Sequence, residues 1–218
     1  ALAPVRLQKG LLLLVPVAGG LQLLGMPEDH TIVFTVMGYE LMPFRVDRLS
    51  LLFGYIFTLA AFIGNVFSLH LRDRLQHVSG LVYAGSALGA VFAGDLITLF
   101  IFWELAAISS VFLIWARRTP ASMGAGWRYL VIQFGSGLLL LAGILIRYSE
   151  TGSLAFTYIG LDGLSGWLIF IAFGIKCAFP LLHSWLTDAY PRATPTGAVF
   201  LSIFTTKMAI YALARGFP

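Results

Sequence analysis

The sequence is poor in charge and has almost no cysteine. Only 11% of its 218 residues are charged and 59% are hydrophobic, whereas about 25% charged residues are usual in soluble domains. The single cysteine, Cys177, excludes an internal disulfide and any metal site built from a cluster of cysteines. The lysines and arginines form no basic run interleaved with aromatic residues, so nucleic acid is not an expected partner. These shortages predict a protein that crosses the lipid bilayer several times.

The common signatures of bound cofactors are also missing. No glycine-rich nucleotide loop, haem ligand pair or iron–sulfur cysteine set occurs in the sequence. We therefore expect no cofactor, no metal site and no redox chemistry of the chain's own. Residues 1–20 lack a typical cleavage site for a signal peptide, and the missing initiator methionine indicates a chain cut or numbered from an internal point.

Apolar stretches predict about seven membrane-spanning helices, so the expected fold is an all-α membrane protein. A span needs about 20 apolar residues, and the first candidate is short. Between the first two spans, weak alternation at residues 31–37 is typical of an extended or hairpin segment outside the hydrocarbon. Gly94 and Asp95 form nearly the whole connection between the third and fourth spans, so these two helices should be antiparallel neighbours. The candidate spans cover residues 10–24, 49–70, 78–94, 95–115, 129–146, 166–190 and 195–213.

The lysines and arginines set the expected orientation, because their excess marks cytoplasmic loops. Alternating the loops places a larger group on one side, which we assign to the cytoplasm, and a smaller group on the other. The acid-rich loop 25–48 then faces outward. The first group comprises Arg6, Lys9, Arg72, Arg74, Arg117, Arg118, Arg128 and Arg192, and the second comprises Arg45, Arg48, Arg147 and Arg215.

Three ionisable residues, Glu104, Lys176 and Lys207, are expected at mid-bilayer depth. At ~1.5 Å of helix rise per residue, Lys176 stands near the middle of its span. Its burial is costly unless it is paired, hydrated or deprotonated. A nearby Glu104 carboxylate would favour the protonated form of Lys176. Separating the two side chains would lower the affinity of Lys176 for its proton, so the pair could act as a switchable proton site. The alternatives are a static ion pair that fixes helix packing and, for Lys207, a salt bridge to a partner subunit.

The sixth span contains Pro180, which should kink or break its helix. Broken helices within membranes expose backbone dipoles where ions bind. His183 would lie on about the same face as Lys176 if helical geometry persisted, so a proton could pass between them through water. Asp188 and Arg192 could guard a proton entrance at the cytoplasmic end. The alternatives are a tolerated kink at Pro180, an interfacial His183 and a loop-fixing pair of Asp188 with Arg192.

At these residues the sequence resembles a known family. The strings GDLITLFIFWE at 94–104 and GIKCAFPLLHSWLTDAY at 174–190, together with the residues that follow 195, resemble the proton-translocating antiporter family. This family includes the antiporter-like membrane subunits of respiratory complex I, their counterparts in membrane-bound hydrogenases, and the large subunits of Mrp-type sodium/proton antiporters. Lys207 and the YALAR string at 211–215 look closer to the Mrp D-type subunit than to the largest complex I subunit.

The resemblance implies more than the composition does. Family members have about fourteen spans with two inverted five-helix repeats, each with a broken helix that carries a key lysine. The chain then holds one repeat at 78–218, preceded by helices and an outer loop at 1–77. Glu104 becomes the acidic partner of Lys176, and Lys207 links this half-channel to the next, while Leu201 stands where some relatives have a histidine. The implied function is translocation of protons, or of sodium and protons, across a bacterial inner membrane with other membrane subunits, in an antiporter or an NADH:quinone-oxidoreductase-type translocase.

Two other functions fit the composition. A seven-helix retinal protein would use Lys207 for a Schiff base and Glu104 as its counter-ion, although a second buried lysine and the break at Pro180 argue against this interpretation. A structural anchor for partner subunits would leave the three mid-membrane charges unexplained.

Overall fold

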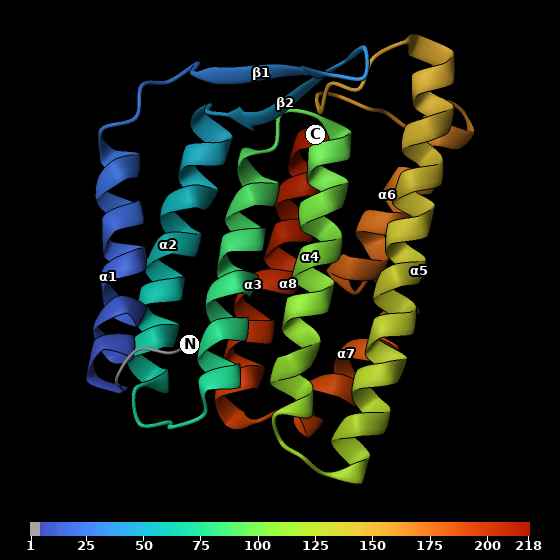
Figure 1. Cartoon of the computed structure of the whole chain (residues 1–218). Coiled ribbons are helices and arrows are strands. Elements are labelled where there is room, and N and C mark those ends of the chain that lie inside the picture. The colour runs from blue at the N-terminus through green and yellow to red at the C-terminus, as the bar shows by residue number, and fades with distance from the viewer. Residues whose placement is uncertain (1–4) are drawn as a thin grey trace.

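The protein is a helical bundle capped at one end by a β-hairpin (Figure 1). The structure, a computed structural model, describes residues 5–218, with side chains from residue 8 onward. The elements, in chain order, are α1 Val5–Leu24, β1 Thr31–Val36, β2 Tyr39–Arg45, α2 Arg48–Ser68, α3 Arg74–Phe92, α4 Leu96–Trp115, α5 Pro120–Thr151, α6 Gly163–Cys177, α7 Ser184–Ala189, the 3₁₀ helix η1 Tyr190–Arg192, and α8 Pro195–Gly216.

The bundle confirms the expected helical membrane architecture. Within residues 8–218, four helices are long and apolar enough to cross a membrane: α2, α4, α5 and α8. The apolar parts of α1 and α6 are shorter, with 17 residues at most. The expected count of seven spans is therefore not fully established, because the apolar parts of α1 and α6 fall short of the about 20 residues that a span needs.

Polar residues at the helix starts explain where these helices begin. Asp47 caps α2 and Thr119 caps α5, and each forms a reciprocal capping box with the serine three residues later. Asp95 caps α4 by accepting hydrogen bonds from the backbone and hydroxyl of Thr98. Such caps satisfy amide groups that have no partner in the first turn of a helix. The apolar runs between these caps then form the spans.

The hairpin expected from residues 31–37 is present and lies across one end of the helical bundle, the end that the sequence predicts to face outward (Figure 1). β1 pairs antiparallel with β2, from Thr31 opposite Arg45 to Val36 opposite Tyr39. The β1 side chains are all exposed. Gly94 donates its amide to the carbonyl of Met42 at 2.8 Å, so the hairpin is tied to the short turn between α3 and α4. As predicted from that turn, α3 and α4 are antiparallel neighbours (Figure 1).

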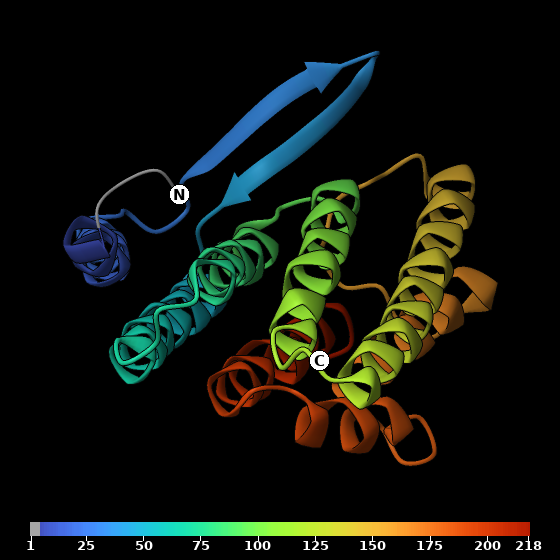
Figure 2. The same ribbon diagram turned by 60° about the horizontal axis from the view of Figure 1, so that its bottom comes forward.

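The last helix, α8, lies at the centre of the bundle. It contacts α2, α3, α4 and α6, whereas α1 stands at the edge beside α2 (Figure 2). The core is built from aromatic and small side chains of these helices, among them Phe57, Tyr83, Trp103, Phe173 and Phe204, each at most 1% exposed. This arrangement puts α6 and its break beside both α5 and α8.

The predicted break in the sixth span is confirmed, and it begins two residues before Pro180. α6 ends at Cys177, and Ala178 adopts a left-handed conformation with φ 61°. A residue that precedes proline is disfavoured in helical geometry, so Phe179 cannot continue the helix. Its amide instead reaches back to the carbonyl of Gly174 at 3.0 Å. The chain resumes helical geometry only at α7.

Candidate functional site

Lys176 is buried in the last turn of α6, with only 1% of the residue exposed. Its Nζ donates a hydrogen bond of 2.9 Å to the backbone carbonyl of Trp103 on α4. The same nitrogen lies 4.4 Å from the centroid of the Trp103 ring, which is a cation–π distance. A cation at the C-terminal end of a helix is also favoured by the helix dipole. The break therefore presents a buried ammonium to α4.

Glu104 follows Trp103 directly but makes a different contact from the one expected. Among the described residues no ion pair joins it to Lys176, and its Oε1 is buried without a hydrogen-bond partner. The carboxylate instead lies over Gly137 of α5, where an added Cβ would collide with Oε1. The ammonium takes the neighbouring carbonyl because the side chain of Glu104 points toward α5. The Lys176 ammonium of α6 and the Glu104 carboxylate of α4 thus have different contacts, although their charges still interact through space.

Helix α5 supplies polar residues that sequence reasoning missed. Ser136 accepts a hydrogen bond from the indole of Trp103 at 3.3 Å and donates to the carbonyl of Ala172 on α6 at 2.8 Å. It therefore fixes the ring that lies against Lys176. Gln133 on the same helix is fully buried. The available signal was the helical spacing of Tyr129, Gln133 and Ser136 within an otherwise apolar span.

A cluster of hydroxyl groups lies between Lys176 and the helix ends that are predicted to face the cytoplasm. Ser110 of α4 and Tyr129 of α5 share a hydrogen bond of 2.7 Å. On the other side of the cluster, Tyr83 of α3 bonds to Thr205 of α8. The hydroxyl of Tyr190 donates to the carbonyl of Leu201 at 2.8 Å. The sequence alone indicates packing as the role of Ser110, and the structure adds a polar partner to that role.

Lys207 does not join Lys176 and Glu104 in this structure. It lies on an exposed face of α8 and donates to the carbonyl of Ser202 at 2.7 Å. Thr205, two residues earlier on α8, is on the opposite, buried face of the helix, with 2% exposed. A Schiff-base lysine of a retinal protein needs an enclosed site, so the exposure of Lys207 gives that alternative no support.

His183 and Asp188 lie on the segment after the break. The helix does not persist through residues 178–183, so His183 is not on a common helical face with Lys176, and its side chain is exposed. Asp188 accepts two hydrogen bonds from Arg128 of α5, at 2.8 and 3.0 Å, and also pairs with Arg192. These contacts tie α7 to α5, as a loop-fixing role would require. They leave the predicted part of Asp188 in proton uptake untested.

The end of α8 nearest the hairpin is held by an ion pair. Arg215 donates to Asp47 at 2.8 Å and to the hydroxyl of Tyr211 at 2.7 Å. Burial acts to raise the pKa of the Asp47 carboxyl, but the hydrogen bonds from Arg215 and Ser50 outweigh it and lower that pKa to about 2. Asp47 therefore stays ionised and connects the start of α2 to the end of α8.

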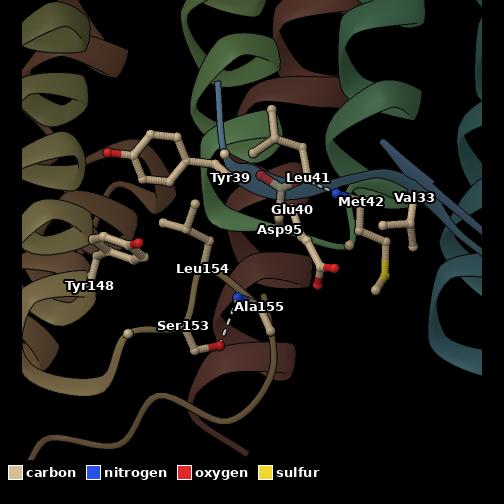
Figure 3. A pocket seen from close by; sticks show the side chains of 13 residues that line it. Val33, Tyr39, Glu40, Leu41, Met42, Asp95, Tyr148, Ser153, Leu154 and Ala155 are labelled. Atoms are coloured by element: carbon tan, nitrogen blue, oxygen red, sulfur yellow. Dashed lines mark hydrogen bonds between the residues drawn. The ribbon is translucent and has the colours of Figure 1, made fainter. Parts of the chain in front are cut away.

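A pocket of about 340 Å³ also lies beside the hairpin (Figure 3), and neither Lys176 nor Glu104 lines it. Its labelled lining includes Tyr39 and Glu40 of β2, Tyr148 of α5, and Asp95. The Asp95 carboxylate is occupied by its cap bonds and by the amide of Met42 at 2.8 Å. Asp95 is thus a structural residue, as expected from its place at the start of α4.

Comparison with known proteins identifies the family. Residues 93–218 match the family described as NADH:quinone oxidoreductase/Mrp antiporter, TM. The chain is 33% identical over 193 residues to the putative antiporter subunit mnhA2 of Staphylococcus epidermidis, covering 80% of this chain and 24% of that protein. It is 30% identical over 191 residues to NADH-quinone oxidoreductase subunit M of Escherichia coli, covering 78% of this chain and 38% of that protein.

The fold is similar to that of a chain in respiratory complex I from Thermus thermophilus, with a TM-score of 0.83, 20% identity, and coverage of 98% of this chain and 48% of that one. The chain thus spans between about a quarter and a half of the length of these relatives. Neither of the two sequence relatives is described as a D-type subunit, so the D-type resemblance stays a prediction. Because the family match covers more than half of the sequence, the chain belongs to the NADH:quinone oxidoreductase/Mrp antiporter transmembrane family.

Proposed function

We propose that this chain is the ion-translocating part of an Mrp-type or complex I-like membrane assembly, and that it moves protons, or sodium and protons, across a bacterial inner membrane. The observation that carries the proposal is the buried ammonium of Lys176 at the end of a broken helix, bonded to the residue that precedes Glu104 on α4. A buried ionisable residue in a membrane helix is costly and marks an ion pathway by default.

The geometry supports a two-position switch. In the observed position the ammonium of Lys176 is held by the Trp103 carbonyl, and the Glu104 carboxylate faces Gly137. Rotation of the Glu104 side chain toward Lys176 would form an ion pair and favour the charged lysine. Rotation back would leave the lysine with a neutral carbonyl partner and favour proton release. The proton affinity of Lys176 then depends on where Glu104 points.

Lys207 is proposed to face the next part of the pathway. Its exposed position on α8 places it where a second repeat or another subunit would cover it. A lysine beneath such a cover would be buried in the assembly and could exchange protons with groups of that partner. His183 and Asp188 lie beyond the break and are proposed to supply protons from the cytoplasmic side.

The test uses vesicles that contain the assembled complex and a pH-gradient dye. Lys176→Ala removes the proton carrier and should abolish transport, and Lys176→Arg should assemble well and transport poorly, because arginine keeps its proton at any working pH. Glu104→Gln should also slow transport, with an effect that is not additive with Lys176→Ala. Lys9→Ala makes the same chemical change outside the site and should leave the rate unchanged. Near-normal transport by a fully assembled Lys176→Ala complex would refute the proposal.

A further inference from the structure

Gln133 is a buried side chain whose polar atoms find no partner within the described part of the chain. It lies in the middle of α5 and is 0% exposed. Neither its Nε2 nor its Oε1 has a hydrogen-bond partner among the described residues. Buried polar groups are nearly always hydrogen-bonded, and a carboxamide that stays unpaired is unfavourable. The carboxamide therefore has room for a polar partner that the side chains of residues 8–218 do not supply.

The neighbours of Gln133 on α5 show where that ligand lies. Gly137 is one turn later and faces the Glu104 carboxylate, whose Oε1 is likewise buried and unpaired. Tyr129 is one turn earlier and bonds to Ser110. Residues four apart lie on the same helical face, so Gln133 lies on the face of α5 that meets α4, between the Glu104 carboxylate and the Ser110–Tyr129 hydroxyl pair.

We propose that Gln133 binds a buried water molecule that also donates a hydrogen bond to Glu104 Oε1. A buried water typically makes about three hydrogen bonds to otherwise unsatisfied groups. The Gln133 amide nitrogen can donate to the water and its carbonyl can accept from it or from a second water, while the carboxylate only accepts. The water supplies the donor that Glu104 lacks when it faces Gly137, so Gln133 is a positioning residue for Glu104.

This inference rests on the proposed switch, because a hydrated carboxylate over Gly137 defines the position in which Glu104 is apart from Lys176. Without the water, the carboxylate loses the partner that stabilises this position and shifts toward Lys176. The pathway should then remain in its ion-paired state for longer, and translocation should slow.

The experiment compares Gln133→Met with Gln133→Asn and Gln22→Met in the assembled complex. Methionine keeps the length of glutamine but cannot bind water, asparagine keeps a carboxamide, and Gln22 is exposed on α1. We expect Gln133→Met to assemble and to transport about tenfold more slowly, Gln133→Asn to recover part of the rate, and Gln22→Met to match the parent chain. Infrared difference spectra in ordinary water and in H₂¹⁸O should show one bound-water O–H band in the parent chain that is lost in Gln133→Met.

Two results would overturn the inference: a bound-water band that persists in Gln133→Met, or transport by that variant at the parent rate. Lys176→Ala measured alongside separates this inference from the proposed function. If Lys176→Ala does not transport while Gln133→Met transports at the parent rate, the proposed water site at Gln133 is wrong and the proposed translocation function stands. If Lys176→Ala is active, the translocation proposal fails, and the infrared band still decides whether Gln133 binds water.

Discussion

Replacing Gly137 with alanine should push the Glu104 carboxylate out of its observed position. The new Cβ would lie 2.6 Å from Glu104 Cδ and would collide with Oε1. Carbon atoms in contact are normally about 3.5 Å apart, so Cδ would have to retreat by about 1 Å and Oε1, which is closer to the new Cβ, by more. The far end of a glutamate side chain can move that distance without unfolding the helix.

The expected cost falls on transport and not on folding. A 1 Å displacement of a reacting group can cost on the order of 100-fold in rate, so we expect Gly137→Ala to transport between about 10-fold and 100-fold more slowly. Alanine favours a helix by about 1 kcal/mol over glycine, which helps to offset the crowding. The variant should therefore assemble.

Gly135 provides the matched control. It lies on the same helix, two residues away, and an added Cβ there would meet nothing within 4 Å. Gly135→Ala gains the same helix propensity and should keep both assembly and transport. The assay is dissipation of a pH gradient in vesicles, normalised to the amount of assembled complex on a native gel. Equal transport by the two alanine variants would refute the role assigned to the Glu104 position.

Three further predictions concern stability, each measured as thermal unfolding of the purified protein in detergent. Asp47→Asn should destabilise the protein by about 2 kcal/mol at neutral pH, because the folded-state pKa of this carboxyl is lowered from 3.8 to about 2. The stability that the ionised Asp47 contributes is fully present above pH ~4 and is lost as the pH falls through ~2. The difference in stability between Asp47→Asn and the parent chain should therefore shrink over this window. A difference that stays constant from pH ~4 to ~2 would contradict the prediction. Ala178→Gly should stabilise the protein by about 1 kcal/mol, because glycine adopts the left-handed conformation without the cost that alanine bears; a lower unfolding temperature would show that the break depends on the alanine methyl group. Trp185→Phe should cost about 1 kcal/mol, because it removes the 2.8 Å hydrogen bond from the indole to the Ile175 carbonyl at the end of α6, while the Ala178 amide still donates to that carbonyl at 3.1 Å. An unchanged unfolding temperature would show that the Ala178 bond alone satisfies the carbonyl.

Much of the architecture could be predicted from the sequence. Low charge and long apolar runs predicted a helical membrane protein, because a backbone in lipid must satisfy its own hydrogen bonds. The hairpin, the antiparallel α3 and α4, and the break near Pro180 followed from local signals, namely strand alternation, a two-residue turn and the missing proline amide. The family resemblance followed from the strings around Glu104 and Lys176 and was confirmed. These features depend on neighbouring residues, so the sequence by itself determined them.

The partners of the buried charges were decided only by tertiary structure. Helical periodicity placed Glu104 and Lys176 in the membrane, but it could not show that the ammonium binds the Trp103 carbonyl while the carboxylate turns to Gly137. Gln133 was overlooked although its helical spacing with Tyr129 and Ser136 marks a polar face of α5, because that spacing does not show which groups the face meets. Side-chain direction across a helix interface depends on how two helices are rotated against each other, and that rotation is set by the packing of the whole bundle. Sequence therefore determined which residues are in the membrane, and packing decided which of them meet.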